Sequence, residues 1–270
     1  MKPWQKAVRY CAIAFAVILI ANIVGWAFGL LGLIFVSPET AISDEPQSFE
    51  FSAEIKDLEI EIPSARLTLK AGDCKVITVK SNLKNLTAKE NGGRLKIKDP
   101  TKGKRQLESA FVEIIYPSGS VFKKVDIDSG AGRLEIVSLS CASFDLDLGA
   151  GETVIDSLTV SELADIDGGA GALNMKNVDI CGIDLDMGIG ELTFSGKLSG
   201  KSEISLGVGE ARFELEGSKN DYSLDLEKGI GDVKVDGTSV GNSKIGDGNT
   251  LIDIEGGVGN IVIDFKDAAE

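Results

Sequence analysis

Apolar and polar residues alternate with a period of two through most of the chain after residue 120. In Val125-Asp-Ile-Asp-Ser129 and in Arg133-Leu-Glu-Ile136, every second side chain is apolar. A period of two indicates β-strands with one buried face. The two runs are separated by Gly130-Ala-Gly132. The local unit is therefore predicted to be a strand, a tight Gly-x-Gly corner and a second strand.

This unit recurs in phase along the chain. Gly-x-Gly stands at residues 130–132, 149–151, 169–171, 188–190, 207–209, 229–231 and 257–259. The first intervals are 19 or 20 residues and the last two are 22 and 28. One unit cannot bury its apolar face alone, whereas stacked units form a continuous core. The pattern predicts an all-β fold, a single-stranded parallel β-helix with about 19–20 residues per coil and a right-handed coil as the expected hand.

Glycine at both corner positions is expected to be structural. It allows a positive φ, and it lacks the Cβ that would collide with the same corner of the next coil. A dinucleotide-binding interpretation fails because no helical pattern follows any of the glycines. We expect the residue between the two glycines to point inward, because it is apolar in every repeat: Ala131, Ala150, Ala170, Ile189, Val208, Ile230 and Val258.

The part of the chain before the regular repeats is predicted to begin the same solenoid. Leu58 to Leu69 copies Val125 to Ile136, with Pro-Ser-Ala in the corner. We assign 50–265 to the solenoid domain, with an irregular part at 50–120 and the repeats at 121–265. Further strands are expected near 75–80, 94–98 and 111–116. Residues 266–270 form a C-terminal tail, and we expect this tail or a partner to cap the C-terminal end.

The N-terminal segment predicts a membrane anchor. Residues 10 to 36 hold no charged side chain across 27 positions. A helix of that length spans about 40 Å, more than the ~30 Å hydrocarbon layer. A signal peptide has a shorter apolar stretch of about 7–15 residues, although Ala41-Ile-Ser43 leaves cleavage open. We predict a cytoplasmic tail at 1–9, a transmembrane α-helix at 10–36 and a linker at 37–49.

Charge sets the expected orientation. Lys2, Lys6 and Arg9 precede the span and no acidic residue does, so the N-terminus is expected in the cytoplasm and the body outside the cell membrane. A tail of about nine residues holds no signalling domain, so any signal would need a membrane partner. Gly25 and Gly29 have the spacing of a transmembrane self-association motif.

Composition excludes several functions. The net charge is −14, and residues 125–270 hold 29 acidic and 10 basic side chains. A body this acidic repels nucleic acid and anionic lipid. The absence of histidine removes the commonest general base and most zinc sites. Four cysteines without paired spacing do not resemble a disulfide framework, so small buried thiols are the simpler interpretation.

Two outward-facing acidic positions in each repeat are the candidate site. In register, they would form two carboxylate columns with a rung every ~4.8 Å. Oxygen-only ligands suit Ca²⁺ or Mg²⁺, and the simpler alternative is a solvated outer face. A polysaccharide-cleaving pair of carboxylates is a weaker hypothesis, because no pair is set apart and the body lacks tryptophan. The candidate metal-ligating residues are Asp126, Asp128, Asp145, Asp147, Asp165, Asp167, Asp184 and Asp186.

The run Phe122-Lys-Lys-Val-Asp-Ile-Asp-Ser-Gly-Ala-Gly-Arg-Leu-Glu-Ile136, repeated after a membrane anchor, resembles a bacterial adhesin-like family called domain of unknown function 4097. The resemblance covers roughly residues 50 to 265. It implies a β-helical surface domain of cell-envelope proteins, some of them associated with envelope-stress systems. It supplies no catalytic residues.

These observations favour a non-enzymatic, membrane-anchored surface module with a binding or structural role, whose candidate partners are an envelope polymer or another membrane protein. The alternative is an accessory component of an envelope stress-sensing system that acts through a membrane partner. A polysaccharide-active enzyme is the third hypothesis.

Overall fold

A computed structural model of the protein describes residues 42–101 and 109–266, which form one sixteen-stranded sheet. The predicted membrane span at 10–36 lies outside the described residues, as does the Gly25–Gly29 motif. Within the described ranges no helix is long and apolar enough to cross a membrane.

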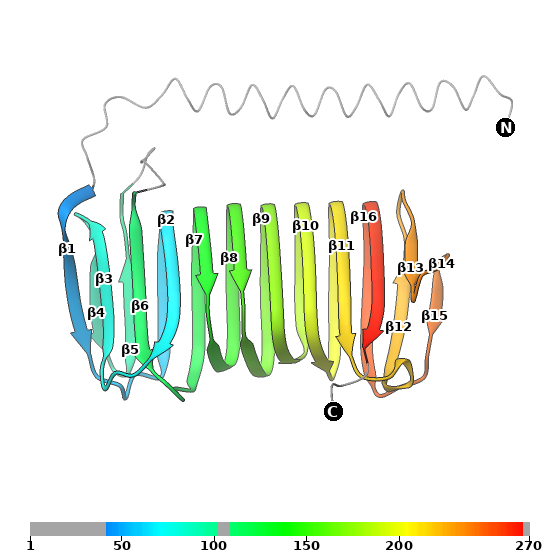
Figure 1. Cartoon of the computed structure of the whole chain (residues 1–270), viewed down its shortest axis with the longest axis horizontal. Coiled ribbons are helices and arrows are strands. Elements are labelled where there is room, and N and C mark those ends of the chain that lie inside the picture. The colour runs from blue at the N-terminus through cyan, green and yellow to red at the C-terminus, as the bar shows by residue number, and fades with distance from the viewer. Residues whose placement is uncertain (1–41, 102–108, 267–270) are drawn as a thin grey trace, which may run out of the picture. The chain divides into compact units, whose positions relative to one another are not determined.

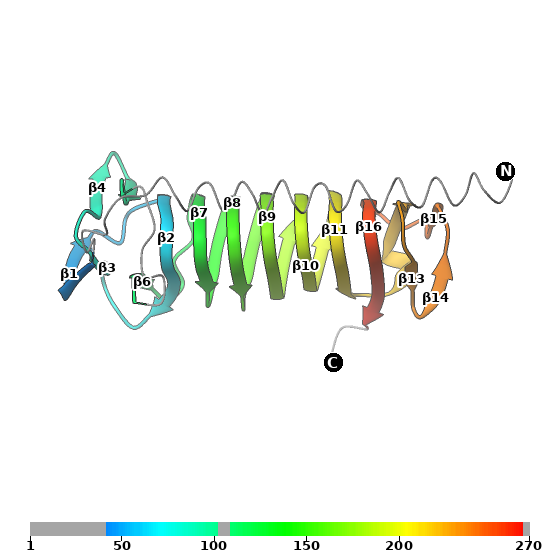
Figure 2. The ribbon, with the colours of Figure 1, turned by 90° about the horizontal axis from the view of Figure 1, so that it is seen from above.

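The middle of the molecule is a regular stack of coils. It consists of β7 (Phe122–Ile136), β8 (Leu139–Ile155), β9 (Leu158–Cys181), β10 (Ile183–Ser199) and β11 (Lys201–Glu216), which lie side by side in chain order (Figure 1). Each long strand bends at its Gly-x-Gly corner, so one strand supplies both halves predicted for a repeat. Figure 2, seen from above, shows each coil returning behind the strand in front.

The register between coils is parallel and follows the repeat. Asp126 lies opposite Asp145, Gly132 opposite Gly151, and Ile136 opposite Ile155. The pairings from β8 to β9, from β9 to β10 and from β10 to β11 continue in the same register. The predicted parallel stacking is therefore confirmed.

The apolar columns form the core. Alternate side chains of each coil point inward, and those three positions before each first glycine are at most 2 % exposed: Ile127, Leu146, Ile166, Leu185, Ile204, Leu226 and Ile254. Because every strand contributes the same inward positions, the buried residues of all coils join in one continuous cluster. At roughly 25 cal/mol per Å² of apolar area, this cluster is the main source of stability.

The first coil is β2 (Asp57–Gly72), as predicted. It pairs in parallel with β7, with Leu58 opposite Val125 and Leu69 opposite Ile136. On its other side, β5 (Arg94–Lys98) pairs with its first half and β6 (Phe111–Pro117) with its second half, both in parallel. The predicted strands near 94–98 and 111–116 are these two.

Antiparallel strands close the N-terminal end. β1 (Ile42–Phe51) pairs with β3 (Ile77–Leu83), β3 pairs with β6, and β4 (Thr87–Asn91) pairs with β5. Residues 42–49, which were predicted as part of a linker, belong to β1, so that assignment is wrong for them. Phe49 and Phe51 pack against the core from this strand, which explains why the segment is ordered as a strand.

The C-terminal end departs from chain order. A 3₁₀ turn, η1 (Lys219–Asp221), leads from β11 to β12 (Tyr222–Glu227). However, the last strand, β16 (Thr250–Lys266), lies between β11 and β12 and pairs in parallel with both. Figure 1 shows β16, in red, between β11 and the orange strands. The stack of corners therefore continues from Gly207 to Gly257 and then to Gly229.

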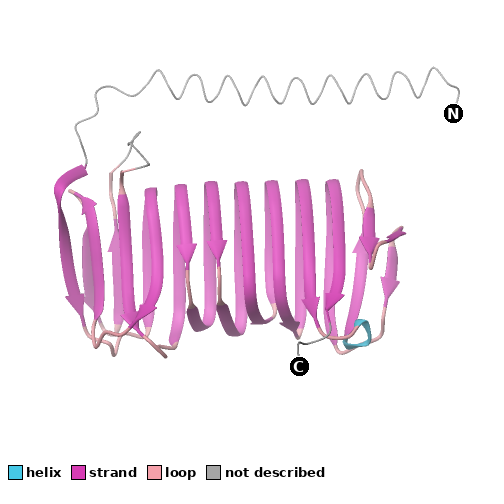
Figure 3. Ribbon diagram, in the orientation of Figure 1, coloured by secondary structure: helices cyan, strands magenta, loops and turns pink. Residues whose placement is uncertain are grey.

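Antiparallel pairing also closes this end. β15 (Ser243–Ile245) pairs with β12, and β14 (Thr238–Val240) pairs with β13 (Val233–Val235). We expected the cap to come from residues 266–270 or a partner, and that expectation is wrong for the end that the structure describes. Both capping strands lie in the 28-residue interval between Gly229 and Gly257 (Figure 3).

The corner glycines are required by the stacking. A Cβ at Gly190 would lie 1.7 Å from the carbonyl oxygen of Gly171 in the preceding coil, and Gly190 has a φ of 149°. Any other residue would meet both a backbone clash and a strained φ. The structural interpretation of the corner glycines is therefore confirmed.

The residue between the glycines points outward, so the prediction that it points inward is wrong. Ile189 is 56 % exposed. The alternation of inward and outward positions breaks at the corner, because Met187 and Leu192 are both buried although they are five residues apart. The positive φ of the second glycine interrupts the pleat, and the middle residue is left on the convex side of the bend.

Candidate binding face

Two columns of carboxylates run along the stack, and all eight predicted aspartates lie in them. The first carboxylate column is formed, in stacking order, by Glu59, Asp126, Asp145, Asp165, Asp184, Glu203, Asp253 and Asp225. The second carboxylate column is formed by Glu61, Asp128, Asp147, Asp167, Asp186, Glu255 and Glu227, with Ser205 interrupting it between Asp186 and Glu255.

The pleat of the strands positions these side chains. Each carboxylate alternates with a buried residue, as Asp145 and Asp147 alternate with Phe144 and Leu146. Because the pairing is parallel and in register, equivalent residues of adjacent coils are neighbours at about 4.8 Å. Two unit charges at this distance repel by about 0.9 kcal/mol even with the dielectric constant of water. The repetition of the sequence therefore forces like charges together.

Basic side chains neutralise the first rungs. Lys96 Nζ lies 2.6 Å from Glu61 Oε1 and also pairs with Glu59, while Lys98 pairs with Glu61. Hydrogen bonds from Lys96 and Lys98 lower the pKa of Glu61. In the next two coils, Lys124 Nζ lies 3.3 Å from Asp126 Oδ2 and 3.1 Å from Asp145 Oδ2.

Basic side chains also reach rungs near the C-terminal end. Lys201 pairs with Glu203, and Lys244 Nζ lies 2.5 Å from Asp225 Oδ2. Lys244 belongs to the capping strand β15, so the cap closes the sheet edge and neutralises the last rung of the first carboxylate column. Both ends of the first carboxylate column are thus bordered by positive charge.

In the middle coils, β8 to β10, five rungs have no basic partner within the described ranges. These open rungs are Asp147, Asp165, Asp167, Asp184 and Asp186. Partial burial, and then repulsion from neighbouring carboxylates, raises the pKa of Asp147, Asp165 and Asp184. A raised pKa means that the charged form is disfavoured here. A bound cation would relieve this repulsion.

The carboxylates do not form a compact chelating site. Among the described residues, no group of three or more acidic or cysteine side chains surrounds one point closely enough to hold a metal ion. The columns are linear, so neighbouring rungs offer oxygens in pairs. Such pairs can bridge a hydrated cation, whereas an all-protein calcium cage needs six to eight oxygen ligands.

A shallow groove borders the second carboxylate column, and the sequence pattern did not predict it. One stretch of about 360 Å³ is lined by Asp147, Asp167, Asp186 and the residues next to them, and another of about 310 Å³ continues past Ser205 to Glu255. Its floor is formed by the residue directly before each first glycine: Leu148, Gly168, Met187, Leu206 and Gly256. At these floor positions, the sequence varies between glycine and larger apolar residues. This variation in side-chain size is the signal that could have predicted a groove.

On the far side of this groove, the outward-pointing middle residues of the corners form a corner ridge. Its members in stacking order are Ala131, Ala150, Ala170, Ile189, Val208, Val258 and Ile230. The ridge changes from alanine to larger aliphatic residues at β10. Ile189, Val208, Val258 and Ile230 are 46–61 % exposed and make up half of the large apolar side chains exposed in the described part of the chain.

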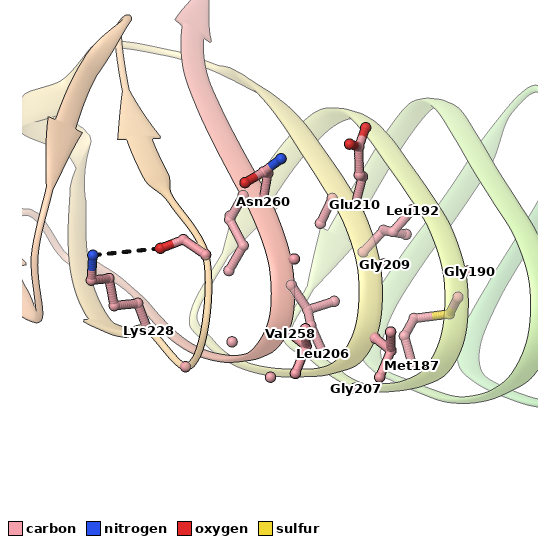
Figure 4. A pocket seen from close by; sticks show the side chains of 18 of the residues that line it. Met187, Gly190, Leu192, Leu206, Gly207, Gly209, Glu210, Lys228, Val258 and Asn260 are labelled. Atoms are coloured by element: carbon pink, nitrogen blue, oxygen red, sulfur yellow. Dashed lines mark hydrogen bonds between the residues drawn. The ribbon is translucent and has the colours of Figure 1, made fainter. Parts of the chain in front are cut away.

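The space inside the corners is too small for a ligand. It holds about 20 Å³ between the glycine backbones and side chains such as Met187 and Leu206, which is room for roughly one water molecule. Figure 4 shows the residues around it, where Lys228 Nζ donates a hydrogen bond to the Gly231 carbonyl oxygen at 3.5 Å. A ligand would therefore have to bind on the outer face.

The described cysteines are free thiols. Cys141 is buried, and burial raises the pKa of its thiol to about 12, which makes it an inert core residue. The interpretation of the cysteines as buried thiols is confirmed for Cys141 and wrong for Cys181, which is exposed at the end of β9.

Comparison with known proteins identifies a family. The model of the family described as Toastrack DUF4097 matches residues 54–263. A comparison with proteins of curated function finds no match.

Solved structures with similar chains were also found. A "putative cell adhesion protein" from Clostridium sporogenes is 20 % identical, with 82 % of this chain and 99 % of that chain covered and a TM-score of 0.35. A "putative adhesin" from Bacteroides fragilis is 12 % identical, with 82 % and 98 % covered and a TM-score of 0.41. A "putative lipid binding protein" from Parabacteroides distasonis is 14 % identical, with 82 % and 98 % covered and a TM-score of 0.38.

Proposed function

Because the chain belongs to the Toastrack family, with a match over residues 54–263, we propose that it is a non-enzymatic binding module displayed outside the cell membrane. The span predicted at 10–36 anchors it, and its acidic outer face binds cations. The observation that carries this proposal is the run of open rungs. Five carboxylates stacked in register without basic partners are costly in the unliganded protein, and cations in the medium would offset that cost.

Display outside the membrane is tested by protease treatment of intact cells, or of protoplasts where a wall intervenes. We expect residues after 36 to be degraded while a fragment containing the anchor remains. A cytoplasmic protein in the same cells must stay intact as the control. A body that survives until the cells are lysed would contradict the orientation.

Cation binding is tested by the melting temperature of the protein in Ca²⁺. Extracellular calcium modules bind at roughly 0.1–1 mM, so a few millimolar Ca²⁺ is about a three- to thirtyfold excess over Kd and stabilises by about 1 to 2 kcal/mol. A few millimolar CaCl₂ should therefore raise Tm more than NaCl at the same ionic strength does. Replacing the five open rungs by Asn should raise the calcium-free Tm and remove the calcium response.

A matched control is offered by the first coil. Glu59→Gln with Glu61→Gln alters rungs that already have lysine partners, so this variant should keep the full calcium response. If CaCl₂ and NaCl act alike on the wild-type chain, the open rungs do not bind the divalent cation and that part of the proposal fails.

An accessory role in an envelope stress-sensing system would add a membrane partner to this module. Exchange of residues 10–36 for an unrelated span tests that role. Display at the surface would persist, whereas a response that depends on contact with a partner in the membrane would be lost.

A further inference from the structure

The larger aliphatic part of the corner ridge is exposed without a structural reason. Ile189, Val208, Val258 and Ile230 follow one another on adjacent coils. None belongs to the buried core or packs against it as a partly buried neighbour. The corner itself requires the two glycines, and it places no demand on a side chain that points into solvent. A row of adjacent exposed aliphatic residues is the kind of surface that marks an interaction site.

Acidic side chains border this row on both sides. On one side, across the groove, lies the second carboxylate column with Asp186, Glu255 and Glu227. On the other side, directly after the second glycines, Glu191 and Glu210 are neighbours on adjacent coils and both are exposed. Neither forms an ion pair with a described residue. The surface is therefore an apolar stripe between two negative borders.

These borders decide between the possible occupants. An anionic membrane surface and a nucleic acid would be repelled by them. A second copy that packed ridge against ridge would bring like charges together on both sides of the contact. A partner with an apolar stripe and basic side chains on both sides of it is complementary in both respects.

The spacing along the ridge favours a helix over an extended peptide. Four rungs at about 4.8 Å span about 14 Å. Three turns of an α-helix, at 5.4 Å each, span about 16 Å, so successive turns stay close to successive rungs. Side chains on one face of an extended strand recur about every 6.7 Å, so they fall out of step with the rungs of the ridge within two rungs. The groove beside the second carboxylate column gives lysine or arginine stems apolar surface to lie on.

We propose that the stripe from Ile189 to Ile230 docks a basic amphipathic α-helix of another polypeptide, aligned with the axis of the solenoid. Its aliphatic residues contact the corner ridge, and its lysine or arginine residues reach the carboxylates on both sides. This inference deepens the proposed function, since it names the class of partner that the acidic face receives.

The test uses the full-length chain in nanodiscs of neutral phospholipid, with empty nanodiscs as the blank. The probe is a fluorescent 18-residue peptide of leucine and lysine patterned as an amphipathic helix. A peptide of the same composition with scrambled order, which has charge but no stripe, is compared with it. We expect the patterned peptide to bind at least tenfold more tightly, with an affinity that falls as salt rises.

Four substitutions address the ridge without touching any carboxylate: Ile189→Thr, Val208→Thr, Val258→Thr and Ile230→Thr. We expect the combined variant to keep its melting temperature and its calcium response and to bind the patterned peptide at least tenfold more weakly. The matched control changes exposed aliphatic residues away from the ridge, namely Val121, Leu163 and Leu251, to Thr, and should bind as the wild type does.

Several outcomes would overturn the proposal. Equal affinities for patterned and scrambled peptides would show that charge alone is recognised. Unchanged binding by the ridge variant would remove the ridge from the site. A wild-type dimer in sedimentation that the ridge variant abolishes would make a second copy the occupant. Loss of the calcium effect with intact peptide binding would refute only the cation part of the proposed function.

Discussion

The first coil, β2, and the middle coils, β8 to β10, have the same backbone path but differ in whether their outward-facing carboxylates have basic partners. In β2, Glu59 and Glu61 face Lys96 and Lys98 of β5 and are neutralised. In β9, Asp165 and Asp167 face only the equivalent aspartates of the coils on either side. The same column positions therefore exist in a neutralised and an open form within one molecule. The solenoid does not require open carboxylates, which makes their persistence in the middle coils a functional question.

The corners differ as well, and the difference explains the glycines. A Cβ at Gly149 would lie 2.1 Å from the carbonyl oxygen of Gly130 in the preceding coil. The first coil has Pro63 at the equivalent position. On that side of β2, β5 pairs with residues 57–61 and β6 with 66–72, so no described strand stacks against the corner. The corner glycines of each coil are thus required by close contact with the coil stacked before it. The first coil has no such neighbour at its corner among the described residues and has no corner glycines.

The largest expected effect on stability comes from valine substitutions that compare a stacked corner with the corner of the first coil. Gly149→Val should destabilise the protein by more than about 4 kcal/mol, because the side chain meets a backbone oxygen that cannot move away. Pro63→Val, at the equivalent position of the first coil, should cost less than about 1 kcal/mol, mainly through a more flexible unfolded chain. Urea unfolding followed by circular dichroism measures both. Similar losses in the two variants would refute the stacking explanation.

A smaller effect should follow from weakening the neutralisation of the first coil, where Lys98 remains beside Glu61 and Arg94 beside Glu59. Lys96→Met removes the ammonium group that lies between Glu59 and Glu61 and keeps most of the side-chain stem. We expect Tm to fall by several degrees at low ionic strength, and the loss should shrink as NaCl screens the two carboxylates. Lys234→Met, in the distant strand β13, serves as a control for the loss of one exposed positive charge. A loss that salt does not reduce would show that packing, and not charge, is responsible.

The smallest expected effect is a pH dependence specific to the open rungs. The raised pKa values of Asp147, Asp165 and Asp184 mean that the folded state takes up protons more readily than the unfolded chain. Their contribution to stability is therefore unfavourable at neutral pH and improves as the pH falls toward the ordinary aspartate value of 3.8.

A variant with Asn at these three positions should melt about 1 to 3 °C above the wild type at pH 7, on the scale of exposed charge interactions. The difference should diminish between pH 7 and pH 4, because the wild-type aspartates become protonated. Glu61, whose pKa is lowered, has the opposite dependence and is present in both proteins. A difference in Tm that stays constant over this range would contradict repulsion as its cause.

Sequence reasoning succeeded where the structure is set by local repetition. The pairing of Leu58 with Val125 and of Leu69 with Ile136, and the register of Asp126, Asp145, Asp165 and Asp184, follow from the period alone. The direction of Ile189 could not be obtained in this way, because the positive φ of Gly190 breaks the alternation on which the prediction relied. The groove depends on side-chain size at the residue before each corner, which a pattern of apolar and polar positions does not distinguish.

The position of β16 was also beyond a repeat-based prediction, since every coil has the same pattern and would pair with any other. The intervals of 22 and 28 residues were the visible sign that the last units are not simple successors. The 28-residue interval supplies β14 and β15 on the way back to the stack. The repeat makes all coils equivalent in sequence, so the order in which they stack can be read only from the contacts in the structure.

The insertion of β16 makes the C-terminal end of the solenoid depend on a strand that comes late in the chain. In a solenoid built in chain order, loss of the last coil would leave a shorter molecule with an intact remainder. Here β16 joins β11 on one side to β12 and β13 on the other, so a chain that stops before Thr250 lacks an interior wall and leaves its end cap without a neighbour. The capping strands come before β16 in the chain, so a product that stops before Thr250 would expose the strand edges of β11 and β12 that β16 otherwise covers.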